Sequence, residues 1–351
     1  MENVCKFFKG RGISKEDLSD TGNPCILYGE LYTTYKTAIA KTIKSRTLLD
    51  LKSLVHSKSN DVLIPCSGET AEDISTSICI PYDDVLIGGD LTIIRSQLNG
   101  AFLSNQINSV RKLDIARIAQ GKSIVHLQAD ELKKINISFP TIDEQLKIAT
   151  FVDLLDQRID TQSKIIEKYE SLIKVINQMM CNFDHEKIQV QNVFDFKEKT
   201  KHQANMGNSQ GNFIYFTNEE STYKYFDSYD FDGEYIIANT GGKANFKYYN
   251  GKFAVMSDCL VMECNDNQNT KFYLYSILNR IDYINQVCFV GSGLKHLDKK
   301  LFLKTFITKF NKNLEPFINL IILLEKKISN DKILLQKLKE QKKYLLSNMF
   351  I

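Results

Sequence analysis

Residues 116–123, which read ARIAQGKS, are the segment of this sequence closest to a catalytic motif. They satisfy a relaxed phosphate-loop pattern, in which backbone N–H groups would surround phosphates and Lys122 would reach them. A phosphate loop of this kind follows a buried strand and opens a helix. Here a polar, helix-like stretch comes first and the strand-like residues 123–127 follow, and the related segment 291–295 lacks the pattern. The sequence therefore argues against a nucleotide site.

The sequence also lacks the motifs that methyl transfer or metal-dependent cleavage would need. Methylation of an exocyclic amine needs a Gly-rich cofactor turn and an Asn/Asp-Pro-Pro-aromatic site, and residues 23–25, NPC, are only a partial echo of the second. Residues 195–199, DFKEK, have the spacing of a solvated charge run rather than of a nuclease centre. No metal-ligand spacing joins the five histidines, which are His56, His126, His185, His202 and His296. We predict no catalytic residue and no metal site, with a magnesium-dependent nuclease as a weak alternative.

DNA contact is a chemistry that the loops could supply. Phosphates are bound by Lys and Arg with polar partners, whereas base edges are read by Arg, Asn, Gln or Lys placed in a groove. In the first half of the chain, the candidate loop residues are Lys9, Arg11, Lys15, Arg95, Asn105, Arg111 and Lys122. In the second half they are Lys199, Lys201, His202, Asn239, Lys243, Asn245, Lys247, Ser292 and Lys295. Residues 241–247, GGKANFK, form the favoured loop, because paired glycines let a backbone approach a duplex closely. For each residue the alternative is an ordinary solvated side chain.

The length and composition of the chain limit the number of domains and the kinds of partner. A chain of 351 residues exceeds what one hydrophobic core usually supports, so two domains are expected. The net charge of +3 is too small to indicate a nucleic-acid partner by itself, so any DNA-binding patch must come from local clustering. The eight cysteines show no C-x-x-C spacing, and no apolar run reaches the length of a membrane span. We therefore expect a cytoplasmic protein with reduced thiols and no membrane contact.

A heptad ladder runs through residues 141–183. Its apolar residues are separated by alternating steps of four and three, and only Gln162 interrupts them. Such a period of 3.5 keeps one stripe of a helix facing a partner helix. The start is marked by Thr141 and Glu144, which form a capping box after Pro140. The predicted seam residues of this helix are Ile148, Val152, Leu155, Ile159, Ile166, Tyr169, Ile173, Ile176 and Met180.

The same ladder returns at the end of the chain, shifted by 169 positions. The polar interruption recurs at the same rung, with Asp331 in place of Gln162. Lys342 is a second break, and we expect it to weaken this helix locally. Pro316 is expected within the first turn, where its missing N–H costs little. The predicted seam residues are Phe317, Ile321, Leu324, Ile328, Leu335, Leu338, Leu345 and Met349.

The duplication extends upstream of each helix. Residues 121–127, GKSIVHL, match residues 291–297, GSGLKHL, and residues 3–8 resemble residues 192–197. Strand-like runs at 62–65, 85–87, 91–95, 234–238 and 253–256 alternate with Gly, Asn and Asp turn signals. We therefore predict an α+β fold with mixed α/β domains at 1–140 and 185–311, and helices at 141–184 and 312–351.

Two helices with matching apolar stripes most simply pair with each other, as an intramolecular coiled coil. If the two equivalent units are related by a pseudo-twofold axis, the helices are antiparallel and separate the domains. Two unlike readers held at a fixed distance would then recognise two short DNA sequences with unread base pairs between them.

The family resemblance lies in the helices. Residues 140–149, PTIDEQLKIA, and the ladder after them resemble the central conserved region of type I restriction–modification DNA specificity subunits. Residues 338–350, LKEQKKYLLSNMF, resemble the C-terminal ending of that family. Residues 10–15, GRGISK, and 26–35, ILYGELYTTY, resemble one of its first target-recognition domains. The second helix departs from the pattern, because residues 313–317 read NLEPF and lack the full Pro-x-x-Glu-Gln start.

This resemblance implies a non-catalytic subunit that binds double-stranded DNA through two target-recognition domains. It also implies two methyltransferase (modification) subunits docked around the helices, and restriction (motor-nuclease) subunits. Those partners would use S-adenosylmethionine, ATP and Mg, and no cofactor is expected in this chain. The alternative is a coiled-coil assembly scaffold whose domains bind proteins. Salt separates the two, because only DNA binding that neutralises phosphates weakens steeply with ionic strength.

Overall fold

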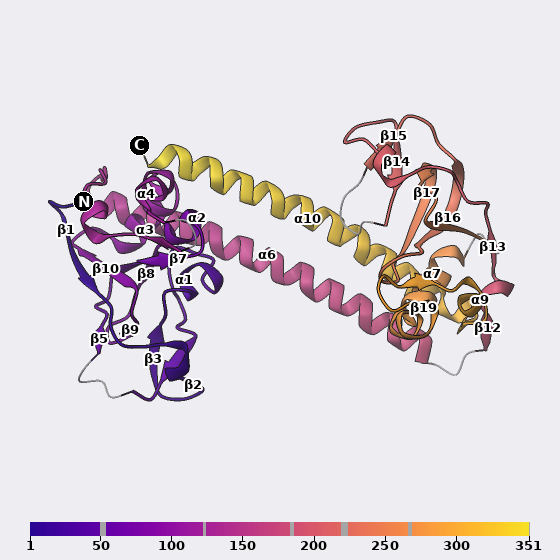
Figure 1. Ribbon diagram of the computed structural model, residues 1–351, viewed down its shortest axis with the longest axis horizontal. Coiled ribbons are helices and arrows are strands. Elements are labelled where there is room, and N and C mark those ends of the chain that lie inside the picture. Colours follow the sequence, from indigo (N-terminus) through magenta and orange to yellow (C-terminus); the bar gives the residue numbers. More distant parts are fainter. Residues whose placement is uncertain (50–53, 122–123, 183–185, 219–223, 266–268, 351) are drawn as a thin grey trace. The chain divides into compact units, whose positions relative to one another are not determined.

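The structure is a computed structural model that describes residues 1–49, 54–121, 124–182, 186–218, 224–265 and 269–350. Strands and short helices alternate through residues 1–140 and 186–314, and a long helix follows each of these regions (Figure 1). These are α6 (Ile142–Asn182), with 41 residues, and α10 (Glu315–Met349), with 35. The predicted α+β fold and the two long helices are confirmed.

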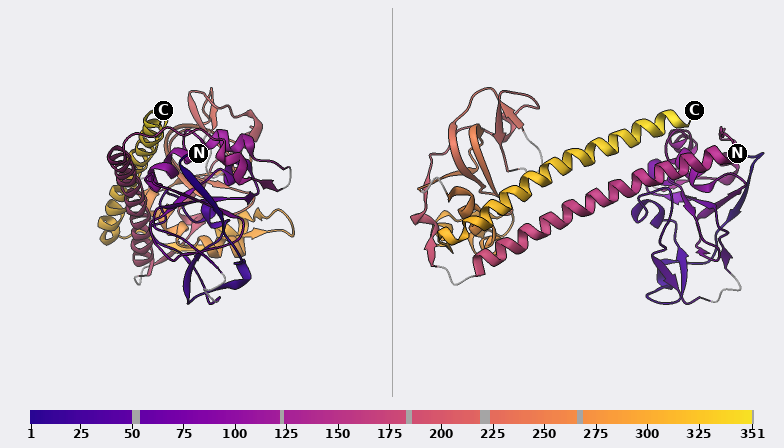
Figure 2. Two further views of the ribbon diagram at one scale, coloured as in Figure 1. Left: turned by 90° about the vertical axis from the view of Figure 1, so that its left-hand side faces the viewer. Right: turned by 180° about the vertical axis from the view of Figure 1, so that it is seen from behind.

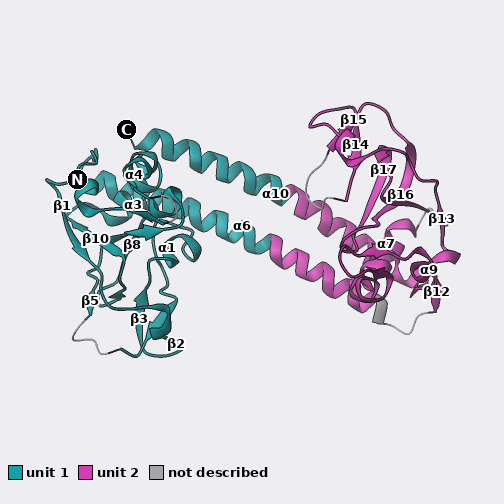
Figure 3. Cartoon of the chain, viewed as in Figure 1, with its two compact units in different colours: residues 1–165, 331–351 teal, residues 166–330 magenta. Residues whose placement is uncertain are grey.

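The chain folds as two compact units, and each unit takes a part of both long helices (Figure 3). Unit 1 comprises Met1–Ile165 and Asp331–Ile351, and unit 2 comprises Ile166–Asn330. The units therefore divide within the helices, whereas the sequence analysis placed its domain limits at the helix ends.

In the described part of unit 1 the strands form two main sheets. One is antiparallel with the order β1-β10-β6-β8, the other has the order β2-β4-β3-β9-β5, and β11 pairs with β7. The turn residues Asn60 and Asp90 have positive φ just before β6 and β10, a conformation that Asn and Asp tolerate. The strands are β1 (Cys5–Lys9), β2 (Leu18–Ser19), β3 (Asn23–Ile26), β4 (Ser45–Thr47), β5 (Val55–His56), β6 (Asp61–Pro65), β7 (Ser67–Gly68), β8 (Ile78–Ile80), β9 (Leu86–Ile87), β10 (Leu91–Ser96) and β11 (Val125–His126).

Short helices cover the first sheet of unit 1. The side chain of Asn99 caps α3 by accepting a hydrogen bond from the Phe102 N–H. Phe102 packs with Ile64 of β6, with Ala149 of α6 and with Phe350, so the sheet, both long helices and α3 share one core. The helices are α1 (Glu30–Thr33), α2 (Ala71–Ile74), α3 (Gly100–Asn108), α4 (Lys112–Ile118) and α5 (Ala129–Lys133).

Unit 2 repeats this plan with a longer sheet. Its order is β13-β18-β16-β17-β14-β15, and β12 pairs with β21 and β19 with β20. The row β13-β18-β16 corresponds to β1-β10-β6 of unit 1, as the repeat predicts. The strands are β12 (Lys187–Gln189), β13 (Phe194–Phe196), β14 (Phe213–Phe216), β15 (Lys224–Phe226), β16 (Phe231–Asn239), β17 (Phe246–Val255), β18 (Cys259–Cys264), β19 (Phe289–Val290), β20 (His296–Leu297) and β21 (Phe306–Thr308).

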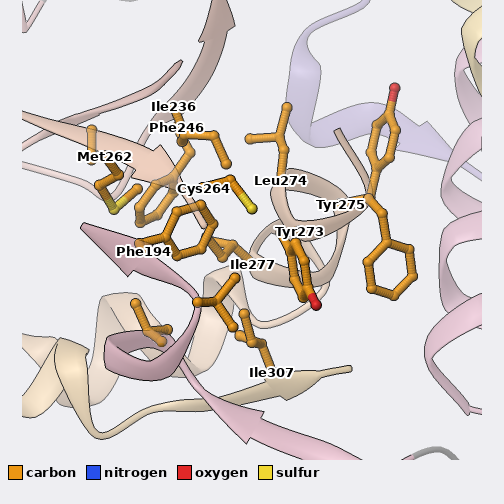
Figure 4. Packing of buried hydrophobic residues seen from close by; sticks show 14 of the residues in the cluster. Phe194, Ile236, Phe246, Met262, Cys264, Tyr273, Leu274, Tyr275, Ile277 and Ile307 are labelled. Atoms are coloured by element: carbon orange, nitrogen blue, oxygen red, sulfur yellow. The ribbon is translucent and has the colours of Figure 1, made fainter. Parts of the chain in front are cut away.

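The core of unit 2 lies between this sheet and α7 (Figure 4). Phe194 and Met262 from the sheet pack with Tyr273 and Ile277 of α7. Besides short 3-10 turns, the other helical elements described in unit 2 are α7 (Thr270–Leu278), α8 (Ile281–Tyr283), a π-helical turn (Ile284–Cys288) and α9 (Lys299–Leu303).

The long helices run side by side in both units (Figures 1 and 2). In unit 1, Ile148 of α6 belongs to the same cluster as Leu346 and Met349 of α10. In unit 2, Ile176 near the other end of α6 packs in the cluster that holds Ile321 of α10. Because the start of one helix meets the end of the other in each unit, the pair is antiparallel, as predicted.

Every residue of the predicted seam is buried or half-buried. Val152, Met180 and Ile321 are 1%, 0% and 0% exposed. The expectation that Lys342 weakens α10 is corrected, because its ammonium group pairs with Asp156 of α6. The seam therefore continues through this position with a charged pair.

The predicted start of α6 is confirmed as well. Glu144 accepts hydrogen bonds from the Thr141 N–H at 3.1 Å and from the Thr141 hydroxyl at 2.8 Å. Gln145, which is 2% exposed, donates to the Pro140 carbonyl and accepts from the Asn99 N–H. The side chain of Gln145 therefore joins the start of α6 to the start of α3.

The remaining expectations on local structure can be compared directly. The predicted strand runs overlap β6, β9, β10, β16 and β17. The cysteines with described side chains are free thiols, and all except the half-buried Cys66 are buried. None of the described helices combines the length and the apolar character needed to cross a membrane.

Candidate nucleic-acid interface

In unit 2, one set of backbone hydrogen bonds joins three loops that carry predicted DNA contacts. The Thr240 N–H donates to the Asp258 carbonyl at 3.0 Å, and the Leu297 N–H donates to the Thr240 carbonyl at 2.9 Å. The Gly242 N–H donates to the Lys295 carbonyl at 2.9 Å. The loop after β16, the turn before β18 and the β19–β20 hairpin therefore lie side by side.

The loop after β16 is held in shape by two asparagines. The Asn239 amide donates to the carbonyls of Gly241 and Lys243, and its oxygen accepts from the Asn245 N–H. Asn285 of the π-helical turn accepts from the Ala244 N–H at 2.7 Å. Asn239 is only 8% exposed, so its amide organises the loop and is not free to read a base.

Residues 199–202 adjoin the same surface. The Ser257 N–H donates to the His202 carbonyl at 2.8 Å, one residue before Asp258. The His202 imidazole lies 2.9 Å from Asp230 and against the ring of Phe226, so it has a structural role. The remaining unit 2 candidates, which are exposed or half-buried on these segments, are Lys199, Lys201, Lys243, Asn245, Lys247, Ser292 and Lys295.

Unit 1 has the same arrangement of backbone hydrogen bonds. We call the two bonds made by the N–H and carbonyl of Thr240 the Thr240 frame, and those made by Cys66 the Cys66 frame. The Cys66 N–H donates to the Asp90 carbonyl at 2.7 Å, and the Leu127 N–H donates to the Cys66 carbonyl at 2.9 Å. These two bonds correspond to those of Thr240 in unit 2, so residues 124–127 are the structural counterpart of residues 294–297. The predicted duplication of these segments is confirmed.

The basic residues at the end of β1 belong to this frame. The Gly10 N–H donates to the Leu91 carbonyl and the Arg11 N–H to the Ile87 carbonyl, so Arg11 lies beside the turn that contains Asp90. Lys9, Arg11 and Lys15 are exposed. Burial raises the pKa of the neighbouring Cys66 thiol, which is thus neutral at pH 7 and lies 3.0 Å from the Thr92 hydroxyl.

Three predicted contacts of unit 1 are corrected or constrained by the structure. Asn105 is 4% exposed inside α3 and donates to the Ala101 carbonyl, so it cannot reach a duplex. The Arg95 guanidinium makes two hydrogen bonds of 2.7 Å to Asp61, which is 1% exposed. Arg111 lies 3.5 Å from Asp114 and is 23% exposed. Lys122 lies outside the described residues.

The structure also bears on the possible phosphate loop and on possible metal sites. Residues 116–118 are the last residues of the helix α4, and the strand β11 follows at Val125, which is the reverse of the order that a phosphate loop needs. Within the part of the chain that is described, no group of three or more His, Cys, Asp or Glu residues could hold a metal ion.

Two exposed residues of this surface were not among the contacts predicted from the sequence. Ile124 is 59% exposed and Leu294 is 69% exposed, and they occupy equivalent positions in the two hairpins. The signal that could have found them is the alignment of residues 121–127 with 291–297, which places an apolar residue at the same point in both.

Comparisons with known proteins agree with this organisation. Residues 1–171 match the family described as the type I restriction modification DNA specificity domain. The crystal structure of the type I restriction–modification system S subunit from M. genitalium aligns with 100% of this chain and 94% of its own, at 16% identity and a TM-score of 0.70. A chain from work on complex assembly and conformational transition of the type I R-M system aligns with 98% of this chain and 95% of its own, at 12% identity and a TM-score of 0.56. No curated protein matches the sequence.

The two kinds of match support each other, because the sequence match covers the first domain and most of α6 while the structural matches cover both halves. Residues 1–171 therefore match the type I restriction modification DNA specificity domain, and the whole chain has the fold of the type I restriction–modification S subunit from M. genitalium.

Proposed function

We propose that this chain is the non-catalytic recognition subunit of a type I restriction–modification enzyme. Each of its two domains reads one half of a bipartite DNA site, and two modification subunits dock on the chain. S-adenosylmethionine, ATP and Mg are used in the partner subunits.

The single observation that carries this proposal is the repeated backbone frame with different side chains on it. The Thr240 frame presents Lys243, Ser292 and Lys295, whereas the Cys66 frame presents Lys9 and Arg11. Backbone geometry positions a reader on the duplex, and the side chains that reach base edges decide which sequence it accepts. A shared frame with unlike side chains suits two readers of the same kind with different sequence preferences.

A second repeated feature supports docking of a partner in two copies. Phe151 and Leu154 on α6 are 43% and 57% exposed, and Leu320 and Leu323 on α10 are 43% and 64% exposed. The two pairs are separated by the same 169 positions as the seam residues. Residues three apart share one face of a helix, so each long helix offers an apolar pair at the equivalent position. Two equivalent docking sites fit two copies of one partner subunit.

The proposal is tested with the chain assembled with its modification subunits and challenged with a pool of random duplexes. We expect the recovered sequences to share two short motifs with a fixed number of unspecified base pairs between them. Binding should also weaken steeply as salt is raised, because phosphate contacts release counterions. Recovery of random sequences, or binding that is insensitive to salt, would leave an assembly scaffold as the better account.

A further inference from the structure

We propose that Leu294 and Ile124 are apolar wedges, each of which enters a base step in its own half of the bound duplex. The inference rests on the proposed DNA-reading function and adds to it a physical contact that neither the charge pattern nor the family match assigns.

The two residues occupy the same point of two equivalent hairpins. In unit 1, Gln120 and His126 exchange hydrogen bonds of 2.9 and 2.7 Å across the hairpin. In unit 2, Val290 and His296 pair at the corresponding place between β19 and β20. Leu127 and Leu297 then anchor the hairpins to the Cys66 and Thr240 carbonyls, so both are fixed to the surface that carries the candidate DNA contacts.

A glycine on each hairpin fixes the carbonyl of the apolar residue. Gly121 and Gly291 have φ of +133° and +136°, which L-residues rarely adopt. A Cβ at Gly121 would lie 2.0 Å from the Ile124 carbonyl oxygen, and one at Gly291 would lie 2.9 Å from that of Leu294. In both hairpins, the backbone of the apolar residue therefore lies too close to the glycine for a larger residue to replace that glycine.

Both side chains are exposed. Leu294 is the most exposed large apolar side chain among the described residues of unit 2, at 69%, and Ile124 is 59% exposed. A Cβ at Gly293, next to Leu294, would meet no atom within 4 Å, so the tip projects into open space. A single exposed apolar residue is ordinary on a protein surface, but the same exposure at the same point of a duplicated hairpin indicates a shared role.

The surroundings of Leu294 favour a polyanion as the occupant. Lys295 and Lys243 are exposed and lie on the two segments joined by the Gly242–Lys295 hydrogen bond. Ser292 adds an exposed hydroxyl on the same hairpin. Protein interfaces bury larger apolar anchors in pockets and deplete lysine around them. One aliphatic side chain between lysines fits the minor-groove wedges that partly unstack a base step while cationic neighbours hold the phosphates.

The role of such a wedge follows from the cost of unstacking. Pyrimidine–purine steps open more easily than others, so a wedge selects sequence without a hydrogen bond to a base. Leu294 and Ile124 would therefore add specificity, whereas Lys243 and Lys295 would add affinity that depends on salt.

The test uses the full chain assembled with its modification subunits and duplexes that carry the bipartite site. Each duplex has one adenine in or beside a half-site replaced by 2-aminopurine, whose fluorescence rises when it is unstacked. The variants are Leu294→Ala and Ile124→Ala. The matched controls are Leu301→Ala, 40% exposed on α9 of unit 2, and Leu113→Ala, 65% exposed on α4 of unit 1.

With the wild-type chain, we expect fluorescence to rise at one step in each half-site. Leu294→Ala should abolish the rise in one half-site only and weaken binding to the specific duplex by about tenfold or more, without changing the salt dependence. Ile124→Ala should do the same in the other half-site, and both controls should bind as the wild type does.

The outcomes separate this inference from the proposed function. If the wild-type chain prefers the bipartite site but fluorescence rises at no step, or rises equally in Leu294→Ala and Ile124→Ala, the wedge is refuted and DNA reading stands. Weaker binding by the variants without a change in stacking would also refute it, because that result indicates a surface contact. A wild-type chain without sequence preference would overturn both proposals.

Discussion

The carboxylate of Asp156 on α6 contacts the ammonium group of Lys342 on α10, with side chains that are 10% and 20% exposed. Next to this pair, Lys41 from the first domain lies 2.5 Å from Asp153. A charged pair at a seam position aligns two helices in one register, because any shift leaves a buried charge without its partner. Asp156 and Lys342 therefore fix the alignment of α6 and α10 in unit 1.

Removal of one member of this pair should destabilise unit 1. Asp156→Ala is expected to lower the free energy of unfolding by about 3 kcal/mol, because it leaves the Lys342 ammonium group buried without its counter-charge. Urea unfolding followed by circular dichroism measures the change. The exchanged pair Asp156→Lys with Lys342→Asp should recover most of the loss. If the exchanged pair is as unstable as the single variant, packing and not charge pairing explains the effect.

The cap at the start of α6 should make its first turn sensitive to acid. Hydrogen bonds from the Thr141 hydroxyl and N–H lower the pKa of the Glu144 carboxyl. Because the folded pKa lies below the unfolded value of about 4.3, the stabilisation is present above that pH and is lost as the pH falls through the folded pKa. Hydrogen exchange at residues 143–146, corrected for the intrinsic rate, should show this loss in the wild type. Glu144→Ala should be less protected at pH 7 and no longer respond to acid, whereas Asp143→Ala should keep the response.

Two arginine–aspartate pairs in unit 1 should differ sharply in importance. Arg95→Met leaves the buried Asp61 carboxylate without its counter-ion and should lower the free energy of unfolding by about 3 kcal/mol. Arg117→Met removes the same charge from a side chain that is 77% exposed and lies 3.6 Å from Asp114. This control should cost about 0.5 kcal/mol or less in urea unfolding. Equal losses in the two variants would show that the Arg95–Asp61 pair stabilises unit 1 no more than the exposed Arg117–Asp114 pair does.

The repeated apolar pairs should each bind one modification subunit. Phe151→Ser with Leu154→Ser is expected to reduce the complex from two modification subunits to one, as is Leu320→Ser with Leu323→Ser. Native mass spectrometry of the assembled complex gives this stoichiometry. Leu172→Ser is the matched control, because Leu172 is 43% exposed on α6 but its counterpart in the repeat is the polar Gln341. A complex that keeps both modification subunits in the two double variants would rule out these docking sites.

The long helices could be predicted from the periodicity of their apolar residues, and many of the strands and turns could be predicted from local sequence patterns. The seam from Ile148 to Met180 could be predicted because a stripe of apolar residues at a 3.5-residue period has to be covered. The hairpins of unit 1 and unit 2 could be aligned because Gly121 and Gly291 meet the same backbone requirement. In each case the sequence pattern that supports the prediction is either local or repeated in the second half of the chain.

The features that could not be predicted depend on contacts between residues that are far apart in the sequence. Asp61 lies 34 residues from Arg95, and Asp156 lies 186 residues from Lys342, so no local pattern connects either pair. Asn105 has the residue type of a base reader, and only the packing of α3 shows that it is buried. Residue type identifies what a side chain could do, whereas the fold decides whether it is accessible.

The central claim is that each domain reads its own half of the DNA site. The most direct measurement is the methylation motif left on DNA by the assembled enzyme when the chain carries Asn245→Ala, Ser292→Ala and Lys295→Ala together, compared with Lys9→Ala and Arg11→Ala. We predict that the first set relaxes bases in one half of a gapped motif and the second set relaxes bases in the other half, with the gap unchanged. Relaxation of both halves by either set, or a motif without a gap, would contradict the account.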